Sequence, residues 1–301
     1  MFRKKSILIL LTILSVLLVQ CGNRSREGFK DFKEFRENEL TTDSSGSFIT
    51  YKNAVFCIPS PQFTSLYLKR LGVYPDRTLI NPASNVEKYT TSTKKAINLG
   101  VYGVDLGYMN VFTVSESTNE YIGIISKLSG DLGLGIVFTR EVYDQIMSLK
   151  SNQDSLARFL SEIFSKADLY LKDNAQQQTG IMVITGGWIE SFYLLCKAYR
   201  KQPGKEITAL IFQQKFVLDN LIKALAPYYN SSSEMQSLID DLVEMAYDFD
   251  VFDFKYSYKL PLYRYRKGVV IFENSIEIQN ASKSIENIYL KIAELRDNII
   301  E

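Results

Sequence analysis

The sequence predicts a mainly α protein: a multi-helix bundle or helical array with a small β-hairpin before the C-terminal helix. Apolar residues recur at helical spacing along most of the chain, and short turns separate these stretches. Only near residues 255–278 does the period change to two, as in a strand. With 301 residues and 46% hydrophobic residues, the chain is long and apolar enough to bury a large core.

The first apolar stretch has the features of an export signal. The basic residues 3–5 precede an apolar run over 7–19, which is too short for a membrane-spanning helix of about 20 residues. Because the run leads into Leu18-Val19-Gln20-Cys21, it resembles the lipobox of bacterial lipoproteins, in which the cysteine is acylated and the preceding peptide removed. Gln20 departs from the small residue that this family favours at that position. An uncleaved anchor or an ordinary secretory peptide are the alternatives.

This resemblance implies a domain organisation and a location. We expect a signal peptide over 1–20, a lipidated N-terminus and polar tether over 21–47, and a single mainly helical domain over 48–301. Several acyl chains on Cys21 would make a stable anchor. Gly22 is not the aspartate that retains such lipoproteins at the inner membrane, so the expected location is the outer membrane, facing the periplasm or the cell surface.

The composition excludes several classes of function. Three of the 35 basic residues precede Cys21, so the mature chain has 32 against 34 acidic residues and no global field for nucleic acid. Histidine is absent, which excludes Ser-His-Asp and Cys-His catalysis and the HExxH zinc motif. Cys57 and Cys196 are too few for a structural zinc site, and no metal or cofactor is expected. Cys196 shares a helical stripe with Trp188, which favours a buried thiol over a disulfide.

Four further stretches have the apolar stripe of a core-facing helix. They lie within 156–171, 207–225, 235–249 and 285–299. Predicted capping boxes begin helices at three serines, each followed three residues later by an acid. These pairs are Ser117 with Glu120, Ser151 with Asp154, and Ser231 with Glu234.

Two other segments, 97–114 and 181–199, are apolar nearly all round, which is typical of helices at the centre of a bundle. The first contains Gly100, Gly103 and Gly107. Since glycine costs about 1 kcal/mol in a helix relative to alanine, this spacing indicates a close approach by another backbone. The same argument applies more weakly to Gly186 and Gly187. Neither segment has a glycine-rich phosphate-binding motif.

Asp105 and Glu190 are isolated carboxylates in these two central segments, and they are the candidate catalytic residues. A buried carboxylate must be paired, hydrogen-bonded or protonated. One interpretation is structural: a tyrosine, a lysine or a capped backbone holds each acid, with Tyr102 and Tyr108 one turn away from Asp105. The other is that both acids converge in one cleft as a ligand site or a carboxylate pair, as in carboxylate hydrolases.

Two surface features have structural and functional interpretations. The acids between 240 and 253 resemble a calcium site but lack the glycine turn and ligand order of an EF-hand, so a solvated helix face is favoured. Within 255–278, tyrosines alternate with arginines at 263–266, and Pro261 limits its strand to an edge or a bulge. This ribbon is either an amphipathic cover for the helices or a surface that stacks on sugars or holds anions.

The segments Tyr102–Leu106 and Gly186–Glu190, with the ribbon and the final helix, resemble a group of helical lipoproteins of Gram-negative bacteria that has no assigned activity. The resemblance implies a fold and a location but no functional residues. We therefore expect a lipid-anchored envelope protein that binds or scaffolds an unknown envelope protein or glycan. The alternative is a carboxylate-dependent envelope enzyme, one directed at glycans.

Overall fold

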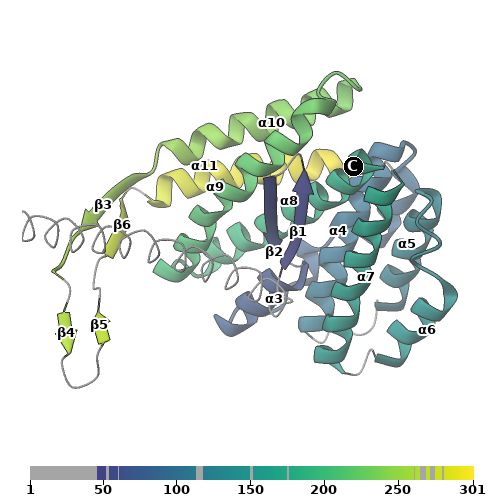
Figure 1. Ribbon diagram of the computed structural model, residues 1–301, viewed down its shortest axis with the longest axis horizontal. Coiled ribbons are helices and arrows are strands. Elements are labelled where there is room, and N and C mark those ends of the chain that lie inside the picture. Colours follow the sequence, from purple (N-terminus) through teal and green to yellow (C-terminus); the bar gives the residue numbers. More distant parts are fainter. Residues whose placement is uncertain are drawn as a thin grey trace, which may run out of the picture. The chain divides into compact units, whose positions relative to one another are not determined.

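Long helices make up most of the chain that the computed structural model describes (Figure 1). The described residues are 46–51, 54–59, 61–112, 118–149, 152–174, 176–260, 262–264, 269–271, 275–279 and 281–301. The predicted signal peptide and Cys21 lie outside them, as does nearly all of the tether. The serines proposed as caps at 117 and 151 also lie outside them.

Most consecutive helices are joined by short connections, and the two longer segments are 71–91 and 251–280. They are α3 (Pro61–Arg70), α4 (Ser92–Val111), α5 (Thr118–Asp131), α6 (Arg140–Leu149), α7 (Gln153–Asp173), α8 (Gln177–Lys201), α9 (Lys205–Leu225), α10 (Ser233–Asp250) and α11 (Ala281–Ile300). Short 3₁₀ turns lie at Arg77–Leu79, Ala83–Lys88 and Ala226–Tyr228. The prediction of a mainly α protein is confirmed, and the helices form a packed array.

Helices α4 and α8 lie at the centre of this array, where they pack against each other and are surrounded by α3, α5, α7, α9 and α11. Every residue of α4 from Ala96 onward is buried. By length and composition α8 could cross a membrane, but 72% of its apolar window is buried inside the fold, as in the core helix of a globular domain. The sequence-based placement of both segments at the centre is therefore confirmed.

Two glycines allow the central helices to approach this closely. A Cβ on Gly100 would lie 1.9 Å from the carbonyl oxygen of Val183, and one on Gly186 would lie 1.8 Å from that of Ile97. Both distances are far below van der Waals contact, so neither position accepts a side chain while the helices stay in place. The prediction of close approach is confirmed at Gly100, and it holds equally at Gly186, which the sequence indicated only weakly.

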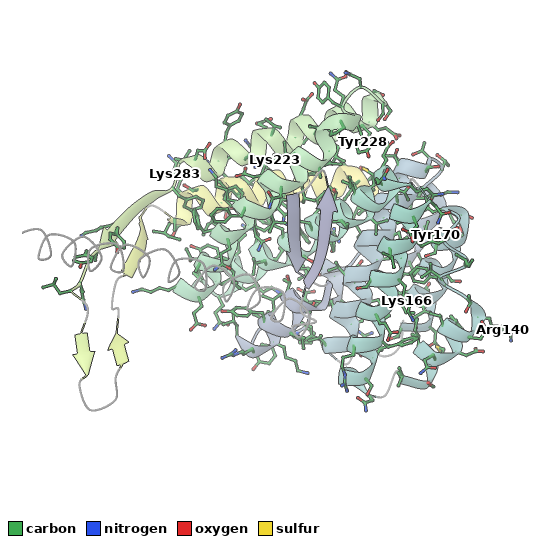
Figure 2. The ribbon with its side chains drawn as sticks, viewed as in Figure 1. Arg140, Lys166, Tyr170, Lys223, Tyr228 and Lys283 are labelled. Atoms are coloured by element: carbon green, nitrogen blue, oxygen red, sulfur yellow. The ribbon has the colours of Figure 1, made fainter. Side chains whose placement is uncertain are left out.

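The other helices bury one face each. The four predicted apolar stripes fall on α7, α9, α10 and α11, while charged side chains such as Lys166 and Lys223 point outward (Figure 2). Helix α10 begins one residue later than predicted: Ser232, not Ser231, is the N-cap, and its hydroxyl accepts from the Met235 amide. At the start of α7 the Asn152 side chain accepts from the Ser155 amide at 3.1 Å.

An aromatic cluster joins α8 to α10. The rings of Trp188, Phe192 and Phe249 stack in series, with centroids 5.2 and 5.9 Å apart. Cys196 lies in the same helix as a free, fully buried thiol, and burial raises its pKa. The expectation of a buried cysteine in the core is thus confirmed.

Short strands flank the helices. Strand β1 (Gly46–Tyr51) pairs antiparallel with β2 (Ala54–Pro59). Between α10 and α11, β3 (Asp253–Ser257) pairs with β6 (Ser275–Gln279), and β4 (Leu262–Arg264) pairs with β5 (Val269–Ile271). Residues 265–268, which would form the turn between β4 and β5, lie outside the described part of the chain. The small β-hairpin before the C-terminal helix therefore stays a prediction.

Candidate functional site

The close packing of α4 and α8 brings the two predicted carboxylates together. Asp105 follows Gly100 by five residues, and Glu190 follows Gly186 by four, so each acid lies just beyond a glycine contact. Both side chains are 0% exposed, and each of the two acids shifts the pKa of the other. The two acids therefore lie near each other, but the place where they meet is not an open cleft.

Glu190 is neutralised by an arginine from the last turns of α11. The Arg296 Nε donates to Glu190 Oε2 at 2.6 Å, and Nη2 donates to Oε1 at 2.9 Å. The same Nη2 also donates to the Leu79 carbonyl oxygen at 2.7 Å. The guanidinium stacks 4.3 Å from the ring centroid of Tyr193. Burial raises the pKa of Glu190, and the bidentate pair with Arg296 opposes this shift by favouring the ionised carboxylate.

Asp105 is in a different state. Its Oδ2 accepts from the Asn81 amide at 3.0 Å, while the buried Oδ1 receives no donor from the residues around it. Two ionised carboxylates buried near each other repel, so the ionised form of Asp105 is disfavoured beside Glu190. Burial and the adjacent Glu190 raise the pKa of Asp105 well above its usual range. We infer that Asp105 is protonated at neutral pH and donates to the Glu190 carboxylate.

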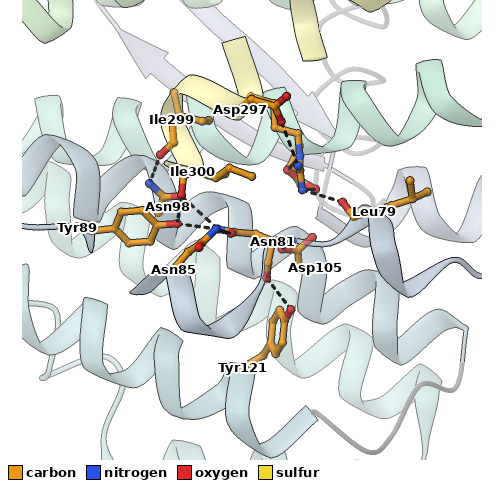
Figure 3. Close-up of polar contacts among 12 residues, drawn as sticks. Leu79, Asn81, Asn85, Tyr89, Asn98, Asp105, Tyr121, Asp297, Ile299 and Ile300 are labelled. Carbon is orange, nitrogen blue, oxygen red and sulfur yellow. Dashed lines mark hydrogen bonds and ion pairs between the residues drawn. The ribbon is translucent and has the colours of Figure 1, made fainter. Parts of the chain in front are cut away.

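A network of amides and tyrosines surrounds the pair, with Asn81 at its centre (Figure 3). Tyr121 Oη donates to the Asn81 carbonyl at 2.6 Å, and Asn81 Nδ2 donates to Tyr89 Oη at 2.9 Å. Tyr89 Oη in turn donates to the Ile300 carbonyl at 3.1 Å, and Asn98 Nδ2 donates to the Ile299 carbonyl at 2.7 Å. The network therefore ties the loop before α4 to α4, α5 and the last turn of α11.

The partners of the acids differ from those that the sequence suggested. Tyr102 Oη donates to the Pro82 carbonyl, and Tyr108 Oη accepts from the Asp76 amide, so both tyrosines bond loop backbone in place of Asp105. The main partner of Glu190, Arg296, was missed. A signal for it was present, because Arg296 follows Ile292 by four residues and so lies on the apolar side of the final helix.

This geometry closes the carboxylate pair off from solvent. A glycoside hydrolase needs its two carboxyl groups on either side of a bound sugar. Here Arg296 and the backbone of Asn81 and Leu79 occupy the surroundings of the pair, and neither acid is exposed to solvent. Among the structurally described residues, no group of three or more His, Cys, Asp or Glu could hold a metal ion. The arrangement links three helices and a loop through one shared charge cluster.

Other features lie apart from this cluster. In the acidic segment of α10, Lys291 bridges Glu244 and Asp248, at 3.0 and 2.7 Å. An open cleft with a volume of about 350 Å³ lies between α4, α8, α10 and α11, and its lining includes neither Asp105 nor Glu190. The buried cluster and the cleft are thus separate features of the same helices.

The protonated state of Asp105 predicts a specific pH dependence. Above about pH 4, near the ordinary aspartate pKa of 3.8, the folded protein retains a proton that the unfolded chain has lost. The free energy of unfolding should then fall with rising pH by about 1.4 kcal/mol per unit from this group, until the pH exceeds the raised pKa. The Asp105→Asn variant lacks this contribution and keeps an amide donor for Glu190. Urea unfolding of both proteins between pH 5 and 8 should show the variant gaining stability relative to the wild type as pH rises. Parallel stability curves would contradict a proton on Asp105.

Comparison with known proteins identifies no relative: no protein-family model matches the chain, and no curated protein or solved structure is detectably similar to it.

Proposed function

We propose that the protein is a lipid-anchored component of the cell envelope that binds or scaffolds another envelope component, with Cys21 carrying the anchor. The observation that carries the choice of binding over catalysis is the closed environment of Asp105 and Glu190. A carboxylate-dependent enzyme would need these acids in contact with a substrate, and both are fully buried beside the Arg296 guanidinium.

The binding surface that we propose extends from the end of α10 into β3 and the residues after it, and we call it the α10–β3 surface. It carries large apolar and aromatic side chains exposed to solvent. They are Tyr247, Val251, Tyr256, Tyr258 and Leu260, with exposed fractions of 58% to 76%. Aromatic residues are enriched in protein interfaces, and neighbouring exposed apolar side chains mark interaction sites.

The basic residues in and after the α10–β3 surface favour a polar envelope partner. Lys255 and Lys259 are exposed between the tyrosines, and Arg264, Arg266 and Lys267 follow in the sequence. The predicted β-hairpin would extend the same basic and aromatic pattern beyond β3. An envelope protein or glycan with acidic and apolar groups fits this chemistry, because tyrosine provides a stacking face and the basic residues provide charge.

Site-specific photo-cross-linking in intact cells tests this proposal. A photoreactive amino acid replaces Tyr258, which is 63% exposed, or Tyr74, which is 86% exposed on the loop after α3. Palmitate labelling of the wild type but not of Cys21→Ser first establishes the anchor. We expect position 258 to give a discrete adduct with one envelope component, and position 74 to give none of that size.

The comparison with Tyr74 shows whether cross-linking is specific to the α10–β3 surface. Since Tyr74 is the more exposed of the two, chance collisions would favour it. Equal adducts at both positions, or no adduct at position 258 in protein shown to be acylated, would contradict the role of the α10–β3 surface.

A further inference from the structure

The cleft between α4, α8, α10 and α11 has the size and the apolar base that are typical of a small-molecule site. Its volume of about 350 Å³ lies within the range of ligand pockets. Four buried apolar side chains line its base: Ile97, Met182, Leu238 and Leu295. They come from four different helices, so the fold as a whole holds the base in place.

Two contacts make this base rigid. Gly186 packs directly on the Ile97 carbonyl, and Asn98 Nδ2 holds the Ile299 carbonyl at 2.7 Å. Ile97 and Ile299 both line the cleft. The cleft is therefore formed before any ligand enters, which lowers the cost of ordering on binding.

The walls of the cleft carry charges of opposite sign. Lys94 stands on the α4 wall and Asp241 on the α10 wall, and both side chains are half-buried. Neither makes a hydrogen bond or an ion pair through its charged group with any residue in the described ranges. Neighbouring charges behave differently: Lys95 pairs with Asp131 at 2.7 Å, and Lys291 pairs with Glu244 and Asp248.

The surroundings of Asp241 favour a cation from outside the chain. Burial raises the pKa of Asp241, and the charges of Glu244, Glu294 and Asp240 raise it further. The second acid of this wall, Glu234, already accepts from Thr91 Oγ1 at 3.3 Å. Bringing an ammonium group to Asp241 would relieve the repulsion, just as a carboxylate would neutralise Lys94 on the opposite wall.

We propose that this cleft binds a small zwitterion, in which an ammonium group meets Asp241, a carboxylate meets Lys94 and an apolar side chain rests on the base between them. A free amino acid and a short peptide share this chemistry. The site is separate from the α10–β3 surface, so cross-linking through Tyr258 neither supports nor excludes it.

Calorimetric titration of the mature chain with leucine and with leucyl-leucine tests the site, and the two probes distinguish the amino acid from the peptide. N-acetyl-leucyl-leucine lacks the ammonium, and leucyl-leucine amide lacks the carboxylate. We expect Asp241→Asn to weaken binding of the preferred zwitterion at least tenfold and to leave the acetylated probe unaffected. Lys94→Met should weaken the zwitterion likewise and leave the amide unaffected.

Matched variants complete the design. Asp144→Asn and Lys223→Met remove the same charges from exposed positions outside the cleft and should bind as the wild type does. Ser237→Trp places a large side chain at the exposed rim of the cleft and should abolish binding without changing the melting temperature. The proposal is overturned if neither probe binds at millimolar concentration, or if the blocked probes bind as tightly as the zwitterion.

Discussion

Replacing Glu190 by glutamine is expected to lower the free energy of unfolding by about 3–5 kcal/mol at pH 7. The substitution keeps the size of the side chain but removes its charge, which leaves the buried Arg296 guanidinium without its bidentate partner and with only the exposed Asp297 carboxylate 3.9 Å away. Arg296 is only 4% exposed and cannot reach water without unpacking the end of α11. The proton that Asp105 donates would also lose its ionised acceptor. Urea unfolding followed by circular dichroism measures the loss.

Two controls separate charge pairing from general damage to the core. Asp297→Asn removes an exposed acid whose carboxylate is 3.9 Å from the Arg296 guanidinium, and it should cost less than about 1 kcal/mol. Asp105→Asn changes an acid in the same buried cluster, but a protonated acid and an amide both donate, so it should be much milder than Glu190→Gln. Equal losses from Glu190→Gln and Asp105→Asn would show that the two acids carry the same charge, contrary to our assignment.

The sequence was sufficient to find the two acids but not to decide their role. Asp105 and Glu190 stand out because their helices are apolar nearly all round, and a charge there must be compensated. The compensation comes from Arg296 and from the backbone of Asn81, which lie 106 residues after Glu190 and 24 residues before Asp105. Helical periodicity describes one element at a time and carries no information about such long-range pairs. The sequence therefore could not show whether the surroundings of Asp105 and Glu190 are open to solvent, because that depends on how the helices pack against one another.

The helices could be predicted because they depend on signals that are close together in the sequence. Their stripes, caps and turns are local signals, and even the error at the start of α10 amounts to one residue, since Ser232 in place of Ser231 accepts from the helix amide. The glycines required more than local information. Gly186 and Gly187 are adjacent in one helix and look equivalent in the sequence, yet only Gly186 faces the backbone of α4 at a distance that excludes a side chain.

Because of this difference, we expect Gly186→Ala and Gly187→Ala to change the free energy of unfolding in opposite directions. Gly186→Ala should destabilise the protein by about 3 kcal/mol or more, at or beyond the upper end of overpacking effects, because the added Cβ would meet the Ile97 carbonyl. A flexible side chain could rotate away, whereas a backbone carbonyl within α4 can move only with its helix. The central pair must then separate, which also disturbs the Asp105–Glu190 contact one turn further on.

Gly187→Ala is the matched control, since its Cβ would lie 3.6 Å from the nearest atom, an ordinary van der Waals contact. Removing a helical glycine there should stabilise the protein by up to about 1 kcal/mol, because alanine loses less backbone entropy on folding. Thermal and urea unfolding of both variants measure the two effects, and soluble yield serves where Gly186→Ala does not fold. Changes of the same sign and size at both positions would contradict the close approach of α4 and α8, and with it the packing that keeps Asp105 and Glu190 away from solvent.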